Sequence, residues 1–345
     1  MVCLDGLLSI FQFCAKREKD ALKIKNFNNL KNAALNRQFN ETYDQTTLDL
    51  TTKILDISPE FFTIWNLRRD VFVNFVFKGR SDQEIHKVIT EELRFVLATM
   101  KRFPKCYWVW NHRIWLLKYN PALTDWDFEL GLIEMFFAAD PRNFHAWQYR
   151  RIVLEGKMDL IRNEEEQPAK AIAKLNYREF QYTTKMINKN ISNYSAWHNR
   201  SKLIEKLSES HPEEAQEFSS KYEILVSEIK LVQTAAFTDP ADSSVWTYMR
   251  WLYTGGFFTT DIEAESFIRL LEEQVAGVKE LAEIEKDENG EENLWCLKTL
   301  SLLLKELFLR TKEDYLREEI NDLTKRLIEL DPMRAERYKD FQRNI

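Results

Sequence analysis

Residues 140–151, DPRNFHAWQYRR, contain a motif that recurs along the chain. Its centre is Trp147, with Phe144 three residues before it and Arg150 three residues after it. Similar segments are centred on Trp65, Trp110, Trp197 and Trp246, at intervals of 37 to 50 residues. A motif that recurs at such intervals indicates a repeat protein, in which each repeat is one small supersecondary unit. We name these five segments the tryptophan motifs.

The tryptophan motifs share three further positions, each present in four of the five. These are a proline six residues before the tryptophan (Pro59, Pro104, Pro141, Pro240), an aromatic residue three before it (Phe62, Tyr107, Phe144, Tyr194) and an arginine three after it (Arg68, Arg113, Arg150, Arg200). Residues three apart lie on the same face of a helix. We therefore expect the tryptophans to fill grooves between repeats, and the arginines to stack on rings or bond helix-end carbonyls. Arg250 departs from the pattern, because it follows Trp246 by four residues.

The segments before the motifs have helical periodicity. In residues 85–100 the apolar side chains recur at steps that place them on one helix face. Ser58-Pro59, Asp140-Pro141 and Asp239-Pro240 each predict an N-cap followed by proline at the first helical position. One helical hairpin cannot bury its apolar faces, but a stack of them can. The pattern therefore predicts an all-α fold, a right-handed superhelical stack of antiparallel helix pairs.

Two less regular motifs extend the repeats toward the C-terminus, one at Trp295 and one at Asp331-Pro332. We expect residues 21–345 to form a single helical-repeat domain, and residues 1–20 to be an N-terminal segment of uncertain role. Polar connections near residues 156–170 and 208–220 are expected to be exposed loops.

Composition narrows the class of protein. The net charge of −6 disfavours bulk binding to nucleic acid or to an anionic membrane, although it does not exclude a local basic patch. The cysteines (Cys3, Cys14, Cys106, Cys296) are scattered, so they predict neither disulfides nor a structural zinc site in this chain. No apolar run is long enough for a membrane span, and reduced thiols favour a cytoplasmic protein.

No self-contained catalytic motif is present. The chain has no H-E-x-x-H, no phosphate-binding glycine loop and no G-x-S-x-G. The residues alone therefore favour a helical scaffold that holds another protein.

One edge of the predicted stack has distinctive chemistry. Positions just before the motif tryptophans vary between repeats, so the scaffold does not dictate them. In the second and third motifs they provide a basic, aromatic and hydrogen-bonding set: Lys105, Tyr107, Asn143, Phe144 and His145. Helix N-termini also favour anions. This edge suits a phosphate or diphosphate, and the alternative is an ordinary solvated rim.

The motifs also carry a family resemblance. PEFFTIWNLRRDV, PKCYWVWNHRIWLL, DPRNFHAWQYRR, NKNISNYSAWHNRS and DPADSSVWTYMRW, in this order, resemble the α subunits of protein prenyltransferases. The resemblance covers nearly the whole chain. KREKDALKIKNFNNL, ENLWCLKTLSLLL and ELDPMRAERY are most similar to the Rab (type II) geranylgeranyltransferase branch. We expect the compact form found in fungi, without the immunoglobulin-like and leucine-rich domains of animal members.

The resemblance implies an activity that depends on a second subunit. Such an α subunit curves around a β subunit that holds zinc and most of the lipid pocket, so this chain is expected to bind no cofactor itself. Zinc activates the thiol of a C-terminal cysteine on a Rab GTPase. The thiolate displaces diphosphate from geranylgeranyl diphosphate and forms a thioether. A Rab escort protein presents the acceptor.

The resemblance assigns roles to the edge residues. Lys105 and His145 match the lysine and histidine that face the diphosphate, and Tyr107 and Asn143 match neighbouring positions. Phe144 stands where the family has tyrosine, so a hydroxyl is missing there. Two alternatives stay open: the α subunit shared by farnesyltransferase and type I geranylgeranyltransferase, and a non-catalytic helical scaffold.

Overall fold

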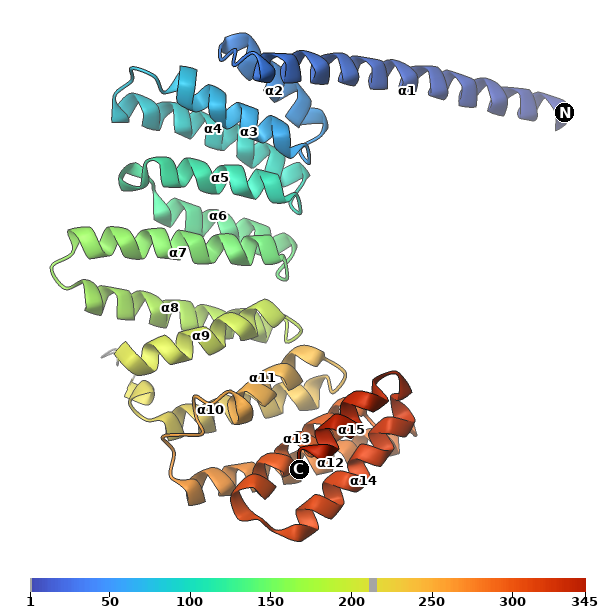
Figure 1. Cartoon of the computed structure of the whole chain (residues 1–345), viewed down its shortest axis with the longest axis vertical. Coiled ribbons are helices and arrows are strands. Elements are labelled where there is room, and N and C mark those ends of the chain that lie inside the picture. Colours follow the sequence, from blue (N-terminus) through green and yellow to red (C-terminus); the bar gives the residue numbers. More distant parts are fainter. Residues whose placement is uncertain (1, 211–215) are drawn as a thin grey trace. The chain divides into compact units, whose positions relative to one another are not determined.

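The computed structural model describes residues 2–210 and 216–345, with side chains described from residue 17 onward except at 18, 216 and 217. These residues form helices and turns and contain no β-strand (Figure 1). The α-helices are α1 (Val2–Phe39), α2 (Gln45–Ile57), α3 (Phe62–Val71), α4 (Asp82–Arg102), α5 (Tyr107–Tyr119), α6 (Trp126–Ala139), α7 (Phe144–Glu164), α8 (Pro168–Lys189), α9 (Tyr194–Ser210), α10 (Lys221–Thr238), α11 (Ser243–Thr254), α12 (Ala264–Asn289), α13 (Leu294–Thr311), α14 (Asp314–Leu330) and α15 (Ala335–Arg343). Short helical segments are η1 (Phe72–Val76, a π-helix), η2 (Pro121–Leu123), η3 (Gln216–Ser219) and η4 (Pro332–Arg334).

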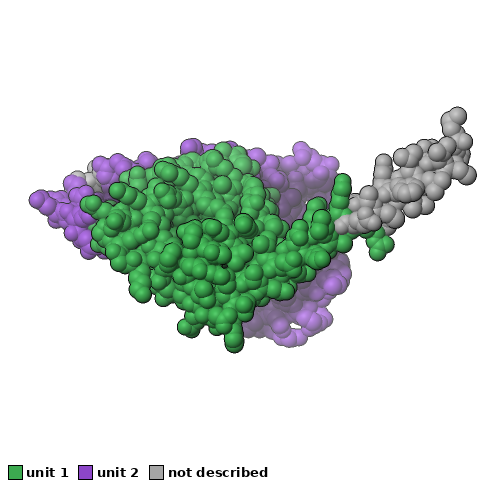
Figure 2. Space-filling model, turned by 90° about the horizontal axis from the view of Figure 1, so that it is seen from above, with its two compact units in different colours: residues 1–160 green, residues 161–345 purple. Residues whose placement is uncertain are grey.

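The helices form two compact units, residues 1–160 and 161–345 (Figure 2). In the first unit α2 packs on α3 and α4 packs on α5. In the second unit α8 packs on α9, α10 on α11, and α12 on α13, with α14 and α15 following. The all-α class and the helix pairs are therefore as predicted. The division at residue 20 stays a prediction, and α1 runs through that position without a break.

Each regular tryptophan motif begins a helix with its aromatic residue, not with its proline. Phe62, Tyr107, Phe144 and Tyr194 are the first residues of α3, α5, α7 and α9. The prediction of an N-cap followed by proline was wrong: Ser58, Asp140 and Asp239 are the C-caps of α2, α6 and α10. A residue before proline is pushed toward extended backbone, so it ends the preceding helix. The proline and two more residues then separate this C-cap from the first residue of the next helix.

The motif prolines have a different function. In all five motifs the tryptophan Nε1 donates a hydrogen bond to the backbone carbonyl six residues earlier, at 2.7 to 2.9 Å. That carbonyl belongs to proline in four motifs and to Ile191 in the fourth along the chain. The tryptophans themselves are at most 3% exposed. Each indole therefore fills the core and also closes the turn that leads into its own helix.

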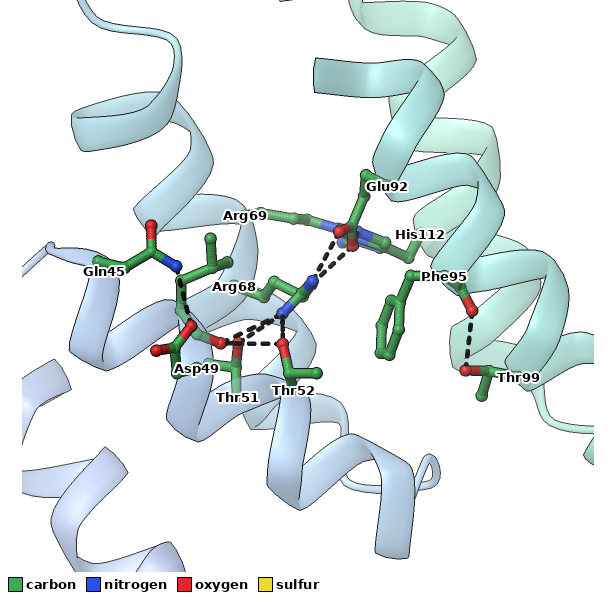
Figure 3. Close-up of polar contacts among 11 residues, drawn as sticks. Gln45, Asp49, Thr51, Thr52, Arg68, Arg69, Glu92, Phe95, Thr99 and His112 are labelled. Atoms are coloured by element: carbon green, nitrogen blue, oxygen red, sulfur yellow. Dashed lines mark hydrogen bonds and ion pairs between the residues drawn. The ribbon is translucent and has the colours of Figure 1, made fainter. Parts of the chain in front are cut away.

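Three of the motif arginines form buried ion pairs with a glutamate of the following α-helix. Arg68 donates from Nε and Nη2 to the two oxygens of Glu92 on α4, both at 2.6 Å (Figure 3). Arg113 pairs in the same two-pronged way with Glu129 on α6, and Arg200 with Glu228 on α10. Bidentate pairs of this kind are among the stronger polar contacts in proteins.

The next motif completes each of these pairs. His112 hydrogen-bonds Glu92 through Nε2, and the hydroxyls of Tyr149 and Tyr248 donate to Glu129 and Glu228. Each glutamate thus joins the arginine of one motif to the residue two after the tryptophan of the next. The expected ring contact also occurs, as in Arg200 over the Phe180 ring at 3.8 Å. The carbonyl that Arg113 bonds is that of Leu93, in the middle of α4 and not at a helix end as predicted.

The sequence carried a signal for these glutamates that the motif alignment did not use. Glu92, Glu129, Glu179 and Glu228 each stand eighteen residues before a motif tryptophan. All four are buried. A glutamate that recurs at a fixed distance before a buried tryptophan predicts a repeated buried partner for a repeated arginine.

The predicted loop near residues 156–170 was wrong, because α7 continues to Glu164 and α8 begins at Pro168. The predicted loop near 208–220 falls partly outside the described residues, and η3 occupies Gln216–Ser219.

Candidate functional site

The turn between α4 and α5 presents the candidate lysine. The side chain of Lys105 is 73% exposed, and its Nζ lies 3.3 Å from the Oδ2 atom of Asp140, whose side chain is 38% exposed. An ion pair this exposed contributes little stability, because water screens both charges. Lys105 can therefore exchange Asp140 for a stronger anion at small cost.

The candidate histidine lies in the first turn of α7, and it is 4% exposed. Its ring packs edge-on against Tyr107, with centroids 4.2 Å apart, and contacts the Phe144 ring at 4.0 Å. Burial lowers the pKa of His145, and it outweighs the hydrogen bond to the Lys105 backbone and the nearby charge of Glu60, which act in the opposite direction. The imidazole is therefore neutral near pH 7, and one of its nitrogens is already engaged with Lys105.

Asn143 belongs to the scaffold of this edge. It is 4% exposed, and its Oδ1 accepts from the backbone N–H groups of His145 and Ala146, which caps the start of α7. Its Nδ2 donates to the Pro104 carbonyl at 3.2 Å. Asn143 thus ties the start of α7 to the turn that carries Lys105, and it fixes their separation.

Two aromatic rings form the exposed part of the edge. Tyr107 is 54% exposed and Phe144 is 51% exposed, with ring centroids 5.8 Å apart. A second pair, Phe62 and Trp108, lies one motif earlier with centroids 5.3 Å apart. Apolar rings gathered at one edge are typical of an interaction surface.

The structure therefore brings all five predicted residues to one edge of the first unit. It adds Asp140, which pairs with Lys105, and Glu60. The charge of Glu60 opposes the effect of burial on the pKa of His145 and adds to the effect of burial on the pKa of Cys106. Glu60 occupies the same motif position as Lys105, five residues before the tryptophan, so alignment of the motifs could have identified it. The Cys106 thiol donates to the Pro59 carbonyl, and burial raises its pKa, which makes it a packing residue.

Within the described part of the chain, no group of three or more His, Cys, Asp or Glu side chains could hold a metal ion. The helices described here also include none that is long and apolar enough to cross a membrane.

Comparison with known proteins identifies the repeat. The family model for the protein prenyltransferase alpha subunit repeat matches residues 89–120, 126–156, 177–207 and 225–255. Each match contains a motif tryptophan and all or part of the helix before it. The matched repeats thus give the class, a repeat protein of the prenyltransferase α-subunit type.

Full-length relatives narrow the class. Geranylgeranyl transferase type-2 subunit alpha of Candida albicans is 35% identical, over 94% of this chain and 92% of that protein. The Saccharomyces cerevisiae protein of the same name is 34% identical over 94% and 93%. The mouse protein is 37% identical over 69% of this chain and 39% of its own length. This chain belongs to the geranylgeranyl transferase type-2 α subunit family, as its motifs suggested.

A solved structure supports the fold. Candida albicans protein geranylgeranyltransferase-I complexed with GGPP contains a chain that matches 92% of this one, with a TM-score of 0.61 and 18% identity. At this identity the likeness concerns the fold alone.

Proposed function

We propose that this chain is the α subunit of a heterodimeric protein geranylgeranyltransferase. The enzyme transfers the geranylgeranyl group from geranylgeranyl diphosphate to C-terminal cysteines of Rab GTPases, as thioethers. Support comes from the names of the full-length relatives and from one observation in the structure. Lys105 and His145 come from different tryptophan motifs, and they lie together at one exposed edge.

Lys105 would stabilise the leaving group. As the bond between the lipid carbon and the diphosphate oxygen breaks, negative charge accumulates on the diphosphate. A cation already held at that position lowers the barrier without reorganisation. The Asp140 carboxylate, 3.3 Å from the Lys105 Nζ atom, would be replaced by the more highly charged diphosphate.

His145 would act only in its charged form. One ring nitrogen is engaged with the Lys105 backbone, so the second nitrogen can donate to an anion only when the ring is protonated. Burial lowers the pKa of His145 in the free chain, but a bound diphosphate would raise it by attraction. Bound diphosphate would thus favour the protonated form of His145, which is the form that can donate to it.

The remaining components belong to the partner subunit in this proposal. Zinc, bound there, would lower the pKa of the acceptor thiol so that the thiolate is available at neutral pH. The exposed rings of Tyr107 and Phe144 would lie in the interface with that subunit, where burial of apolar surface stabilises the heterodimer. A Rab escort protein would present the flexible acceptor tail.

The test is affinity purification of the tagged chain from its own cells, followed by mass spectrometry. We expect a prenyltransferase β subunit together with a Rab escort protein. A farnesyltransferase-type β subunit without an escort would assign the chain to the shared α subunit of the enzymes that recognise C-a-a-X tails. Absence of any β subunit would leave a non-catalytic scaffold and overturn the proposal.

A further inference from the structure

The second unit contains a cavity that the proposed function does not use. Its volume is about 740 Å³, and residues of α11, α13, α14, η4 and α15 line it. Cavities of this size commonly bind small molecules or side chains of a partner. Four of the lining residues are cations: Arg250, Lys298, Arg334 and Arg337. No aspartate or glutamate is among the lining residues.

Arg250 faces this cavity because its tryptophan motif is irregular. In a regular motif the residue three after the tryptophan is the buried arginine, but after Trp246 that position holds Met249, which is 1% exposed. The cation is displaced by one residue, which rotates it about 100° around the helix. Arg250 is therefore exposed and lines the cavity.

Two of the four cations share the single carboxylate of Asp331. Asp331, 7% exposed, pairs with Lys298 at 3.1 Å and with Arg334 at 3.0 Å, and it also accepts from the Tyr338 hydroxyl. Among the described residues, Arg250 and Arg337 have no carboxylate within ion-pair distance. One buried carboxylate against four cations leaves the cavity strongly positive.

The walls between these cations are largely apolar. Trp295 and Tyr338 flank Lys298, whose Nζ lies 5.3 Å and 5.8 Å from the two ring centroids. Leu294, Leu302 and Leu327 add aliphatic surface. A ligand that fits must therefore combine negative charge with an apolar group.

The local backbone favours carboxylates over phosphate. Phosphate sites usually add free backbone N–H groups at a helix N-terminus. At the start of α13 the backbone N–H groups of Trp295 and Cys296 already donate hydrogen bonds to the Asn293 side-chain oxygen. Anion recognition here rests on guanidinium groups, which pair with carboxylates and with phosphates in a planar, two-pronged geometry. The preference for carboxylates therefore comes from the lack of added backbone donors at the start of α13.

We propose that this cavity binds an acidic peptide segment of a protein partner. Carboxylates of the segment would pair with Arg250 and Arg337, and one bulky apolar side chain would pack against Trp295 and Tyr338. The proposal is independent of the prenyltransferase chemistry, because the cavity lies in the second unit and shares no residue with the Lys105 edge.

The test is fluorescence anisotropy with the full chain and fluorescein-labelled peptides at low salt. The probe is Asp-Glu-Phe-Glu-Asp. The comparison probes are Asp-Glu-Ser-Glu-Asp, which lacks the ring, and Lys-Lys-Phe-Lys-Lys, which reverses the charge. Inorganic diphosphate serves as competitor. The variants are Arg250→Gln and Arg337→Gln, with Arg269→Gln on the exposed surface of α12 as the matched control.

We expect saturable binding of the acidic phenylalanine peptide and weaker binding of both comparison peptides. Each cavity variant should weaken binding by about tenfold, the usual scale for one charge-assisted hydrogen bond, whereas Arg269→Gln should leave it unchanged. Binding unaffected by Arg250→Gln and Arg337→Gln, or no saturable binding, would overturn the proposal. Diphosphate that displaces the peptide at lower concentration than the peptide itself would identify a phosphate site instead.

Discussion

Within the first turn of α7, adjacent residues have separate functions. Asn143 caps the helix and bonds the Pro104 carbonyl, whereas Phe144 is half exposed at the edge. His145 lies against the Tyr107 ring, and Trp147 is buried and bonds the carbonyl of Pro141. The motif therefore combines invariable packing positions with positions that can be adapted to a ligand.

The His145 proposal predicts a characteristic pH dependence. Donation to diphosphate requires the imidazolium, because one ring nitrogen is engaged with the Lys105 backbone. Burial lowers the pKa of His145, so the imidazolium is favoured at low pH. Wild-type enzyme should exceed His145→Gln in single-turnover rate by roughly tenfold or more at pH 6. This advantage should shrink as pH rises toward 8.5, because glutamine donates at every pH. A ratio that stays constant would indicate that His145 only packs.

A second histidine predicts how stability depends on pH. His112 is fully buried beside Glu92, and burial, despite the Glu92 hydrogen bond, lowers its pKa from 6.5 to about 4. The unfolded chain therefore binds a proton first, and stability is lost as pH falls from 6.5 toward 4. At 1.36 kcal/mol per pKa unit the loss reaches about 3 kcal/mol at pH 4.

The measurement is the denaturation midpoint of wild type and His112→Gln between pH 7 and pH 4.5. The wild type should lose more stability than the variant across this range, because glutamine keeps a donor for Glu92 but does not titrate. Parallel curves for the two proteins would show that His112 is not the group responsible.

At the scale of the helices, the sequence was a better guide to the buried residues than to the first residue of each helix. The recurrence of tryptophan identified the five motif indoles as buried, because a repeat must bury the same position each time. It did not identify Trp126, which is buried at the start of α6 outside the motifs. The helix starts were misplaced, because Asp140-Pro141 reads equally as an N-cap or as the end of the previous helix. The partner of each arginine was missed because the glutamates lie outside the motif, on the neighbouring helix.

The candidate edge followed from the same reasoning, in part. Lys105 and His145 were predictable because they occupy motif positions that vary between repeats. The Asp140 partner of Lys105 was not, because it depends on two turns lying side by side. The cavity of the second unit could not be predicted from the sequence either, because its lining comes from four segments that are separated along the chain.

Packing between α6 and α7 predicts opposite effects at two glycines. A Cβ atom at Gly156 would lie 2.3 to 2.6 Å from ring carbons of Trp126, whereas at Gly131 it would meet nothing within 4 Å. Gly156→Ala should therefore lower the free energy of unfolding by about 1–3 kcal/mol. Gly131→Ala, on an exposed helix position, should raise it by about 0.5–1 kcal/mol. Chemical denaturation measures both, and a neutral Gly156→Ala would contradict the packing of Trp126.

At the scale of the whole molecule, each compact unit carries a charged feature that the repeat itself does not require. The first unit carries the Lys105–His145 edge, and the second carries the basic cavity around Arg250. Neither is a complete catalytic set. Of the two, only the Lys105–His145 edge enters the proposed transferase function, in which the other parts come from a partner subunit.

The most direct test of this view is the single-turnover rate of Lys105→Ala in the assembled heterodimer with geranylgeranyl diphosphate and its Rab acceptor. Lys118→Ala is the matched control, because Lys118 is exposed at the opposite end of α5. We predict a fall in the chemical rate of about tenfold or more for Lys105→Ala, with unchanged assembly, and no change for Lys118→Ala. An unchanged rate for Lys105→Ala in an intact heterodimer would contradict the assignment of this edge to the diphosphate.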